Sequence, residues 1–256
     1  MGKVNKATMS ETFKFLNINF NSLDITGTIS TIEKLVENRT PAMFFSLSAE
    51  LITMAQKNER LRNIYTQSKI VTIDSYVVYY LTKLFGNKIS EPVSASRVMF
   101  NMLPVAEKKN YRIFLLGASE EVISKVVENL GNTYKNINIV GYSNGYFNKN
   151  NDTEIINKIT QSRPDILFVG MSSPLKEYFI YSHLADMNVP ISIGVGGIFD
   201  IIAGECKLAP HWVSKIGLEW FYRFLQEPRR MWKRYLITNS KFVILLFKEL
   251  FKSKNH

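Results

Sequence analysis

The chain has 256 residues, of which 46% are hydrophobic and 21% charged, a composition typical of a folded globular protein and not of a disordered one. No apolar run approaches the roughly 18 residues that span a bilayer, and no apolar leader is visible at the N-terminus. The single cysteine, Cys206, excludes an intrachain disulfide and a cysteine-based metal cluster, so we expect a protein of the reducing cytoplasm.

The net charge of +10 is concentrated near the C-terminus. From His211 onward there are ten Lys and Arg against three Glu, whereas the preceding 210 residues carry 22 basic and 19 acidic side chains. A basic tail favours nucleic acid, an anionic membrane surface or a phosphorylated ligand as a partner. Composition alone does not choose among the three.

Short apolar runs alternate with amphipathic segments along most of the chain, and they predict alternating strands and helices. Strands are predicted at 13–20, 43–47, 70–73, 112–116, 137–140, 166–169 and 191–194. Helices are predicted near residue 30, where Ser30 and Glu33 fit a capping box, at 49–60, and from Asp74 to residue 85. The later strands recur about every 25 residues, which predicts right-handed βαβ units around a mainly parallel sheet.

Glycines recur where the predicted strands end, at Gly117, Gly141, Gly170, Gly194, Gly196 and Gly197. A glycine there permits a tight turn and lets a ligand approach the backbone, although strand-to-helix turns favour glycine in any case. The series points to the carboxyl edge of the sheet as the place for a ligand. No segment matches a P-loop or a GxGxxG fingerprint, so neither ATP hydrolysis nor dinucleotide binding is supported.

Charged side chains also lie where strands give way to helices. Asp74 is placed to act as a general base or to cap the helix after it. Lys176 and Glu177 begin a helix whose N-terminus can hold an anion. Asp200 follows the Gly196–Gly197 turn and can accept hydrogen bonds from a uracil or a ribose, or cap a helix.

No metal site is predicted, because the three histidines have no ligand spacing and no Asp-x-Asp pair occurs. A diphosphate would then be met by backbone N–H groups and cations such as those after Pro210. Two or three amphipathic helices, broken near Pro228, are predicted there. Their apolar stripe at 242–251 fits an anionic membrane interface and, equally, a helix packed on the core. The basic cluster comprises Arg223, Arg229, Arg230, Lys233 and Arg234.

A long ungapped match to the signature of one family lies at 194–236, which reads GVGGIFDIIAGECKLAPHWVSKIGLEWFYRFLQEPRRMWKRYL. In this segment the chain resembles the WecG/TagA/CpsF family of bacterial glycosyltransferases, glycosyltransferase family 26. Further blocks follow the family's order: SLSAEL from Ser46, IDSYVV from Ile73, IFLLGAS from Ile113, INIVGYSNGYF from Ile137 and FVGMSSPLKE from Phe168. The resemblance implies a Rossmann-like, mainly parallel sheet with helices on both faces in residues 1–209, and a basic, mostly helical appendage at 210–256.

The resemblance also implies an activity. Members of this family transfer a sugar, typically N-acetylmannosamine or its uronic acid, from a UDP donor to a sugar on an undecaprenyl diphosphate lipid. The reaction inverts the anomeric centre without a metal or other cofactor and serves teichoic acid, common antigen or capsule synthesis. The enzyme is then peripheral on the inner face of the membrane, with an appendage that closes the active site and docks on anionic lipid. No nucleic-acid partner is expected, and the oligomeric state stays open between a monomer and a homo-oligomer.

Carried over position by position, the resemblance assigns the catalytic base to Asp74. It assigns stabilisation of the leaving UDP diphosphate to Arg223 and Arg230. The substrate-binding positions that it implies are Ser46, Ser48, Tyr146, Gly170, Lys176, Gly196, Gly197, Asp200, Arg229 and Lys233.

Several positions depart from the family pattern around the implied sugar sites: Ser46 for Thr, Ser48 for Asn, Ser75 for Gly, Lys176 for Gln, and a loop that reads Ser94-Ala95-Ser96-Arg97. One explanation is a changed donor or acceptor, since Arg97 and Lys176 add positive charge that suits an acidic sugar. The other is a weakened paralogue or a membrane scaffold without turnover. Retention of Asp74 and the arginines favours the first, and a nucleic-acid-binding α/β protein is the most remote alternative.

Overall fold

The computed structural model describes residues 11–147, 152–229 and 240–247. Its centre is a six-stranded sheet in the order β4-β3-β8-β7-β5-β6, in which every neighbouring pair is parallel. The sheet confirms the predicted α/β class, and each of its strands overlaps a predicted one. The strands are β3 (Met43–Leu47), β4 (Ile70–Ile73), β5 (Arg112–Gly117), β6 (Asn138–Ser143), β7 (Ile166–Gly170) and β8 (Ile191–Gly194).

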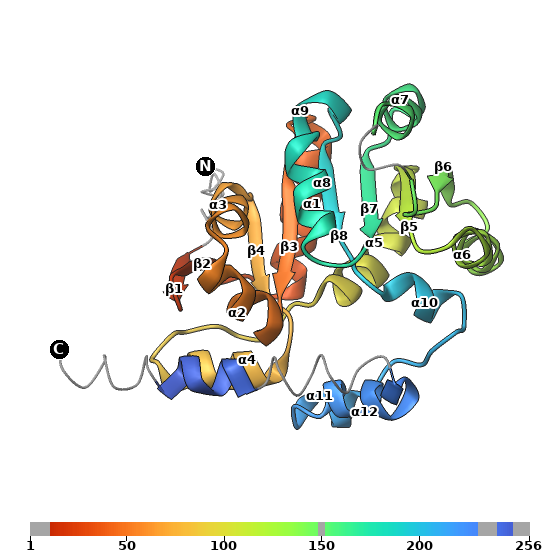
Figure 1. Ribbon diagram of the computed structural model, residues 1–256. Helices are drawn as coiled ribbons and strands as arrows, with labels where there is room; N and C mark the ends of the chain where they lie inside the picture. Colours follow the sequence, from red (N-terminus) through yellow and green to blue (C-terminus); the bar gives the residue numbers. More distant parts are fainter. Residues whose placement is uncertain (1–10, 148–151, 230–239, 248–256) are drawn as a thin grey trace, which may run out of the picture.

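Helices cover both faces of the sheet (Figure 1). One face packs against α2 (Ala49–Lys57), α3 (Glu59–Gln67), α7 (Thr153–Ser162), α8 (Leu175–Ser182) and α9 (Leu184–Met187). The other face packs against α1 (Ile25–Asn38), α5 (Ala95–Lys109), α6 (Glu120–Thr133) and α10 (Ile198–Ile202). Because side chains alternate along a strand, Phe45 and Leu47 of β3 enter the first core and Phe44 enters the second.

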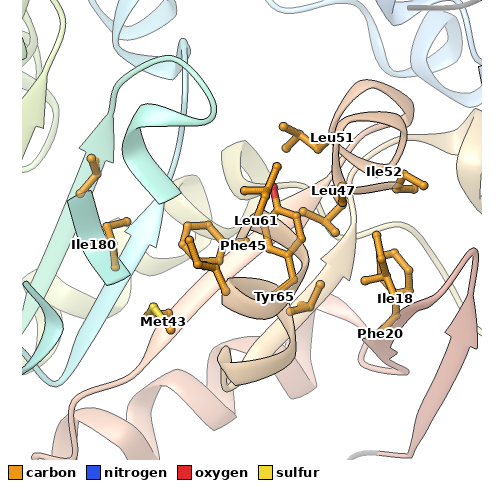
Figure 2. Packing of buried hydrophobic residues seen from close by; sticks show 14 of the residues in the cluster. Ile18, Phe20, Met43, Phe45, Leu47, Leu51, Ile52, Leu61, Tyr65 and Ile180 are labelled. Carbon is orange, nitrogen blue, oxygen red and sulfur yellow. The ribbon is translucent and has the colours of Figure 1, made fainter. Parts of the chain in front are cut away.

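Figure 2 shows the first core, in which aromatic and aliphatic side chains from distant parts of the sequence meet. The rings of Phe45 and Tyr65 pack edge to face with centroids 5.8 Å apart. Ile18, Phe20 and Ile180 add further buried surface. Each such side chain stabilises the fold by about 1.5–3 kcal/mol when fully buried, and together they hold the strands in register.

The segment at 13–20 is a hairpin and not the single strand that its apolar run predicts. Leu16 and Asn17 have φ values of 48° and 60°, so the chain turns back between β1 (Thr12–Phe15) and β2 (Ile18–Asn21). The hairpin lies against the outer strand β4, where the Asn21 Oδ1 accepts a 2.7 Å hydrogen bond from the Val71 N–H. It therefore covers an edge of the main sheet.

Two helix predictions needed correction. Ser30 and Glu33 lie inside α1 and do not cap it, because the helix starts earlier, where Asp24 accepts a 2.7 Å hydrogen bond from the Gly27 N–H. The helix predicted at 49–60 is two helices, α2 and α3, that meet at Asn58. The Asn58 side chain accepts from the Leu61 N–H at 3.0 Å and so starts the second helix.

The carboxyl ends of all six strands lie at one edge of the sheet. In Figure 1 the strand arrows point toward α4 (Tyr76–Leu84), α11 (His211–Lys215) and α12 (Glu219–Gln226), which lie at this edge. After β3 the chain passes to one face of the sheet, and after the neighbouring β8 it passes to the other. Such a reversal is where open α/β sheets bind their ligands.

The C-terminal segment 240–247 is helical, and it divides its apolar side chains between the core and solvent. Phe242 is buried in the first core and Leu245 and Leu246 pack against it, whereas Ile244 and Phe247 are exposed. No helix among the described residues is long and apolar enough to cross a membrane. Arg230, Lys233 and Arg234 lie outside the described residues.

Candidate active site

Asp74 is held at the carboxyl edge by the end of β3. Its backbone N–H donates to the Leu47 carbonyl at 3.1 Å, and its Oδ1 accepts a 2.9 Å hydrogen bond from the Ser46 hydroxyl. The same hydroxyl accepts a 2.9 Å hydrogen bond from the Ala95 N–H, which fixes the direction in which it donates. Asp74 does not cap the helix that follows, since the N-cap position of α4 is Ser75. Its carboxylate therefore belongs to the site and not to the helix.

Opposing influences set the proton affinity of this carboxylate. Burial raises the pKa of Asp74 above the usual range of an aspartic acid. The hydrogen bond from Ser46, the charge of Lys176, the Ala95 N–H and the charge of Arg223 all act to lower it, and burial outweighs them. A carboxylate with a raised pKa is a stronger base than a free aspartate.

Lys176 is buried beneath this edge with a carboxylate of its own. Its Nζ lies 2.7 Å from Glu177 Oε1, and both side chains are almost completely enclosed. The Ser173 hydroxyl donates to the same oxygen at 3.0 Å and also contacts Lys176 Nζ. Gly194 makes room for the lysine stem, because a Cβ at that glycine would lie 3.1 Å from Lys176 Cε. The charge of Lys176 is therefore paired within the fold, although it still lowers the pKa of Asp74.

Arg97, the other cation that departs from the family pattern, also has a carboxylate partner, in a pair that is partly exposed. Its Nη2 lies 3.0 Å from Glu91 Oε2, and its Nη1 donates to the Pro92 carbonyl at 2.6 Å. Arg97 and Lys176 thus each have an internal carboxylate partner. This removes the structural reason for expecting an acidic sugar.

Arg223 brings the appendage to the carboxyl edge. Its guanidinium lies over Gly197, where Nη2 would be 2.6 Å from a Cβ added to that glycine. It is flanked by Asp200 at 4.0 Å and by Glu227 at 3.7 Å. Both distances are too long for strong hydrogen bonds, so the guanidinium is positioned without being fully engaged. A cation in this state at the strand ends is suited to an anionic group of a ligand.

Three contacts hold α11 and the turn after it against α4, the helix that follows Asp74. The Tyr80 hydroxyl donates to the Lys215 carbonyl at 2.9 Å. Gly217, with φ of 80°, lies so close to Val77 that an added Cβ would be 2.8 Å from Val77 Cγ2. The rings of Tyr76 and His211 meet edge to face with centroids 6.4 Å apart. The start of the appendage is therefore docked beside the helix that follows Asp74.

Glu219 is a member of this cluster that the sequence interpretation missed. It opens α12, two residues after Gly217, and the negative charge of Asp74 acts on its carboxyl group. Although Glu219 as a residue is exposed, burial of its carboxyl group, followed by the charge of Asp74, raises its pKa to about 7. A hydrogen bond with Ser214 and the charge of Arg223 oppose this rise. Glu219 is part of the recognisable GLEW block, but nothing in that block indicates that the charge of Asp74 acts on it.

The remaining predicted positions are spread along the same edge. Ser48 is the N-cap residue of α2 and makes no side-chain cap bond. Gly170 is packed so closely under Phe199 that an added Cβ would be 2.3 Å from the ring. Tyr146 is 82% exposed on the loop after β6, beside Gly145, whose N–H donates to the Ala118 carbonyl at 2.9 Å. An exposed aromatic ring at this edge is available to stack on a planar ligand.

The structure thus brings one set of predicted residues together and leaves others apart. Those that meet around Asp74 are Ser46, Lys176, Arg223, Gly197 and Asp200. Gly196 has φ of 62° and open space around it, which suits a backbone that a ligand approaches. Arg229 is exposed, and Arg230 and Lys233 lie outside the described residues. Over the described parts of the chain, no three His, Cys, Asp or Glu gather in a way that could hold a metal ion.

A model of the Glycosyl transferase WecG/TagA/CpsF family matches residues 13–256. The chain belongs to this family. The match confirms the resemblance that the sequence motifs predict, and it makes the protein a WecG/TagA/CpsF glycosyltransferase, hence an enzyme. The carboxylate, the glycine turns and the basic appendage described above are therefore features of a sugar-transferring enzyme.

Three relatives are similar to this glycosyltransferase over most of their length. A Bacillus subtilis (strain 168) protein is 32% identical over 234 residues, which cover 91% of this chain and 90% of the relative. A Bacillus spizizenii (strain W23) protein is 28% identical, with 93% and 92% covered, and one from Staphylococcus aureus (strain MW2) is 26% identical, with 86% and 85% covered. All three are named N-acetylglucosaminyldiphosphoundecaprenol N-acetyl-beta-D-mannosaminyltransferase.

Proposed function

We propose that this glycosyltransferase moves N-acetylmannosamine from a UDP donor to an N-acetylglucosamine carried on undecaprenyl diphosphate, with inversion at the anomeric carbon and without a metal. The acceptor and sugar are those in the names of the three relatives. The observation that carries the proposal is the partly buried Asp74 carboxylate, oriented by Ser46 and subject to the charge of Arg223 of the appendage. A base and a cation on one ligand-binding edge are what an inverting sugar transfer needs.

In the proposed reaction Asp74 removes the proton of the acceptor hydroxyl. The hydroxyl oxygen forms the new bond to the anomeric carbon from the side opposite the leaving group, which inverts that centre. The bond from the anomeric carbon to the diphosphate oxygen breaks, and its electron pair leaves with UDP. Arg223 stabilises the charge that develops on the diphosphate, with Arg229, Arg230 and Lys233 as further cations of the appendage.

The nucleotide is proposed to bind along the edge from β8 to β6. Gly196 and Gly197 let the diphosphate approach the backbone. Asp200 accepts a hydrogen bond from the ribose or the uracil. Beside the Gly170 turn, the ring of Tyr146 stacks on the planar part of the nucleotide. Ser48 lines the sugar end with Ser46. Lys176 acts from below, where its charge lowers the pKa of Asp74 and keeps part of the carboxylate population ionised.

The donor sugar is proposed to be the neutral N-acetylmannosamine and not its uronic acid. An acidic sugar would need a cation that is free to meet it. The two cations that set this chain apart, Arg97 and Lys176, are each already paired with a carboxylate. Burying a further anion without a cation of its own beside the enclosed Lys176–Glu177 pair would be costly.

The enzyme is also proposed to work as a peripheral protein on the inner face of the membrane, because the acceptor is a lipid. Exposed apolar side chains gather on α4 and α11: Tyr80, Leu84, Trp212 and Ile216. Lys83 and Lys215 lie among them in the sequence. Apolar side chains interleaved with cations are typical of a surface that rests in an anionic lipid interface.

The test is a donor panel with a short-chain lipid diphosphate acceptor that carries N-acetylglucosamine, with product detected by mass spectrometry. UDP-N-acetylmannosamine is expected to be used, and the uronic acid donor is expected to react at least about tenfold more slowly. Asp74→Asn is expected to lower kcat by a factor of about 100 or more and to leave UDP binding, measured by calorimetry, unchanged. Absence of turnover with every donor, or an active Asp74→Asn enzyme, would refute the proposal.

A further inference from the structure

The helix α12 carries Arg223 to the site although none of its eight residues is buried. The rings of Trp220 and Phe221 pack edge to face on each other with centroids 5.7 Å apart, and Leu225 is 62% exposed. Burial of apolar surface therefore contributes little to fixing this helix over the strand ends, so its polar contacts with the rest of the fold matter.

A pair of hydrogen bonds holds the C-terminal end of α12. The Lys207 N–H donates to Gln226 Oε1 at 2.8 Å, and Gln226 Nε2 donates to the Lys207 carbonyl at 3.1 Å. One side-chain amide thus engages both backbone groups of one residue, as a neighbouring strand does in a sheet. Because only the amide oxygen accepts and only the nitrogen donates, the side chain has a single orientation that makes both bonds.

Lys207 lies in the connection between α10 and α11, and this connection is tied to the core. The Asp200 carbonyl accepts a 2.9 Å hydrogen bond from the Glu205 N–H, which closes a turn just before Lys207. Glu205 Oε1 lies 2.9 Å from the Nζ of Lys125, and Asn129 donates to the carbonyl of the last residue of α10 at 2.8 Å. Lys125 and Asn129 belong to α6, which packs on the sheet. The Lys207 backbone is therefore an anchored point to which α12 is attached.

Arg223 lies one turn before Gln226, on the same face of α12. Its guanidinium lies over Gly197, where a Cβ added to the glycine would be 2.6 Å from Nη2. Its contact with Asp200, at 4.0 Å, is too long to fix the guanidinium there. Arg223 and Gln226 thus face the two ends of the segment 197–207, and the strong hydrogen bonds are those of Gln226.

We infer that Gln226 is a positioning residue that holds Arg223 over Gly197. The inference rests on the proposed function, in which Arg223 stabilises the leaving diphosphate beside that glycine. Gln226 itself touches no substrate in this scheme and acts through Arg223. Without its two hydrogen bonds the end of α12 is free to shift, and a displacement of about 1 Å in a catalytic group can cost as much as a hundredfold in rate.

The experiment is a double-mutant cycle of Gln226→Met and Arg223→Ala in the full chain, with UDP affinity measured by calorimetry. Methionine has about the length of glutamine but makes neither hydrogen bond. Gln226→Met is expected to weaken UDP binding about fivefold when Arg223 is present, and kcat/KM with UDP-N-acetylmannosamine should fall by at least the same factor. In the Arg223→Ala protein the same change is expected to weaken UDP binding less than about twofold, because the guanidinium that it positions is absent.

A matched control is Gln56→Met. Gln56 lies in α2, and its Nε2 donates a 2.6 Å hydrogen bond to the Leu16 carbonyl in the N-terminal hairpin, so this change also removes a bond between a helix and distant backbone. Its UDP affinity is expected to equal that of the wild type, and thermal unfolding of each variant shows whether the fold is intact.

Three results overturn the inference alone: unchanged UDP affinity in Gln226→Met, an equal loss with and without Arg223, or an equal loss in Gln56→Met. Unchanged UDP affinity in Arg223→Ala would instead overturn the role of Arg223 in the proposed function, and the inference with it. The two failures are therefore distinct.

Discussion

The Ser46 hydroxyl donates a 2.9 Å hydrogen bond to Asp74 Oδ1 and accepts one of the same length from the Ala95 N–H. The strand β3, the turn after β4 and the start of α5 are thereby joined at one oxygen atom. The hydroxyl has one proton, and because the N–H of Ala95 can only donate, that proton must point to Asp74. The side chain of Ser46 thus orients the base and favours its ionised form.

Removing this hydroxyl is expected to weaken the enzyme in a pH-dependent way. In Ser46→Ala the pKa of Asp74 rises further, because the hydrogen bond that lowers it is lost. The ionised base is then lost at a higher pH, so the acid-side midpoint of kcat/KM moves up. At pH 7 the loss is expected to be about tenfold or more, since a hydrogen bond to a charged group contributes about 1.5–3 kcal/mol. Ser46→Thr keeps the hydroxyl and should keep the profile; a Ser46→Ala profile equal to that of the wild type contradicts the assignment.

Gly197→Ala is expected to impair catalysis without unfolding the protein. The added methyl would lie 2.6 Å from Arg223 Nη2, the far end of a flexible side chain, so the guanidinium moves and the helix does not. A displaced cation stabilises the leaving diphosphate less well, and kcat is expected to fall about tenfold. Steady-state kinetics and thermal unfolding measure the two effects.

The matched control for that substitution is Gly131→Ala. Gly131 lies in α6 with open space around its Cβ position, far along the sequence from the site. Alanine there should leave kcat unchanged and stabilise the helix by about 0.5–1 kcal/mol. If both variants keep full activity, Arg223 does not act where we place it.

Lys176→Gln restores the usual family side chain and is expected to destabilise this protein. Glu177 is fully enclosed, and the change removes the cation 2.7 Å from it. Leaving one member of a buried ion pair without its partner is expected to lower the free energy of unfolding by about 3 kcal/mol, which urea denaturation measures. The double change Lys176→Gln with Glu177→Gln should recover much of that loss.

An exposed ion pair, Lys158 with Glu154, is the control for the buried pair of Lys176 and Glu177. Lys158 and Glu154 are 2.9 Å apart, but their side chains are 54% and 81% exposed. Lys158→Gln should therefore cost less than about 1 kcal/mol. Equal losses in Lys158→Gln and Lys176→Gln would mean that Lys176 is not held as a buried ion pair.

Membrane binding is expected to depend on the apolar side chains of α4 and α11. Leu84 is 79% exposed and Trp212 is 68% exposed, and each can enter a lipid interface. The double change Leu84→Ser with Trp212→Ser should lower binding to phosphatidylglycerol-rich vesicles about tenfold or more, measured by co-sedimentation. UDP binding should be unaffected. Tyr142→Ser removes a 44% exposed aromatic on β6 and serves as the control, since that ring lies on the edge strand. Equal binding by all three proteins would contradict the proposed surface.

The sequence alone predicted most of the architecture, because buried parallel strands have a strong local signature. Runs such as Ile70–Ile73 and Ile166–Gly170 are mostly apolar and buried on both faces. The first is followed by Asp74 and the second ends at Gly170. The predictions failed where a single backbone angle decides, as at Leu16 and Asn17, whose left-handed turn makes a hairpin from one apolar run. They failed also where a side chain earlier or later in the chain supplies the cap, as Asp24 does for α1.

The candidate site likewise has some residues that the sequence predicted and some relationships that it did not. Asp74 and the glycine turns could be placed from the sequence, because the carboxyl ends of parallel strands must share an edge. Whether the charges of Lys176 and Arg97 are unpaired could not be predicted from the sequence. It depends on whether Glu177 and Glu91 meet them in the folded chain. The influence of Asp74 on Glu219 could not be predicted either, because residues so far apart in the sequence act on each other only in the folded chain. The local pattern of residues determined the elements and the position of the base, and only long-range packing decided which charges are neutralised and which remain to act on a ligand.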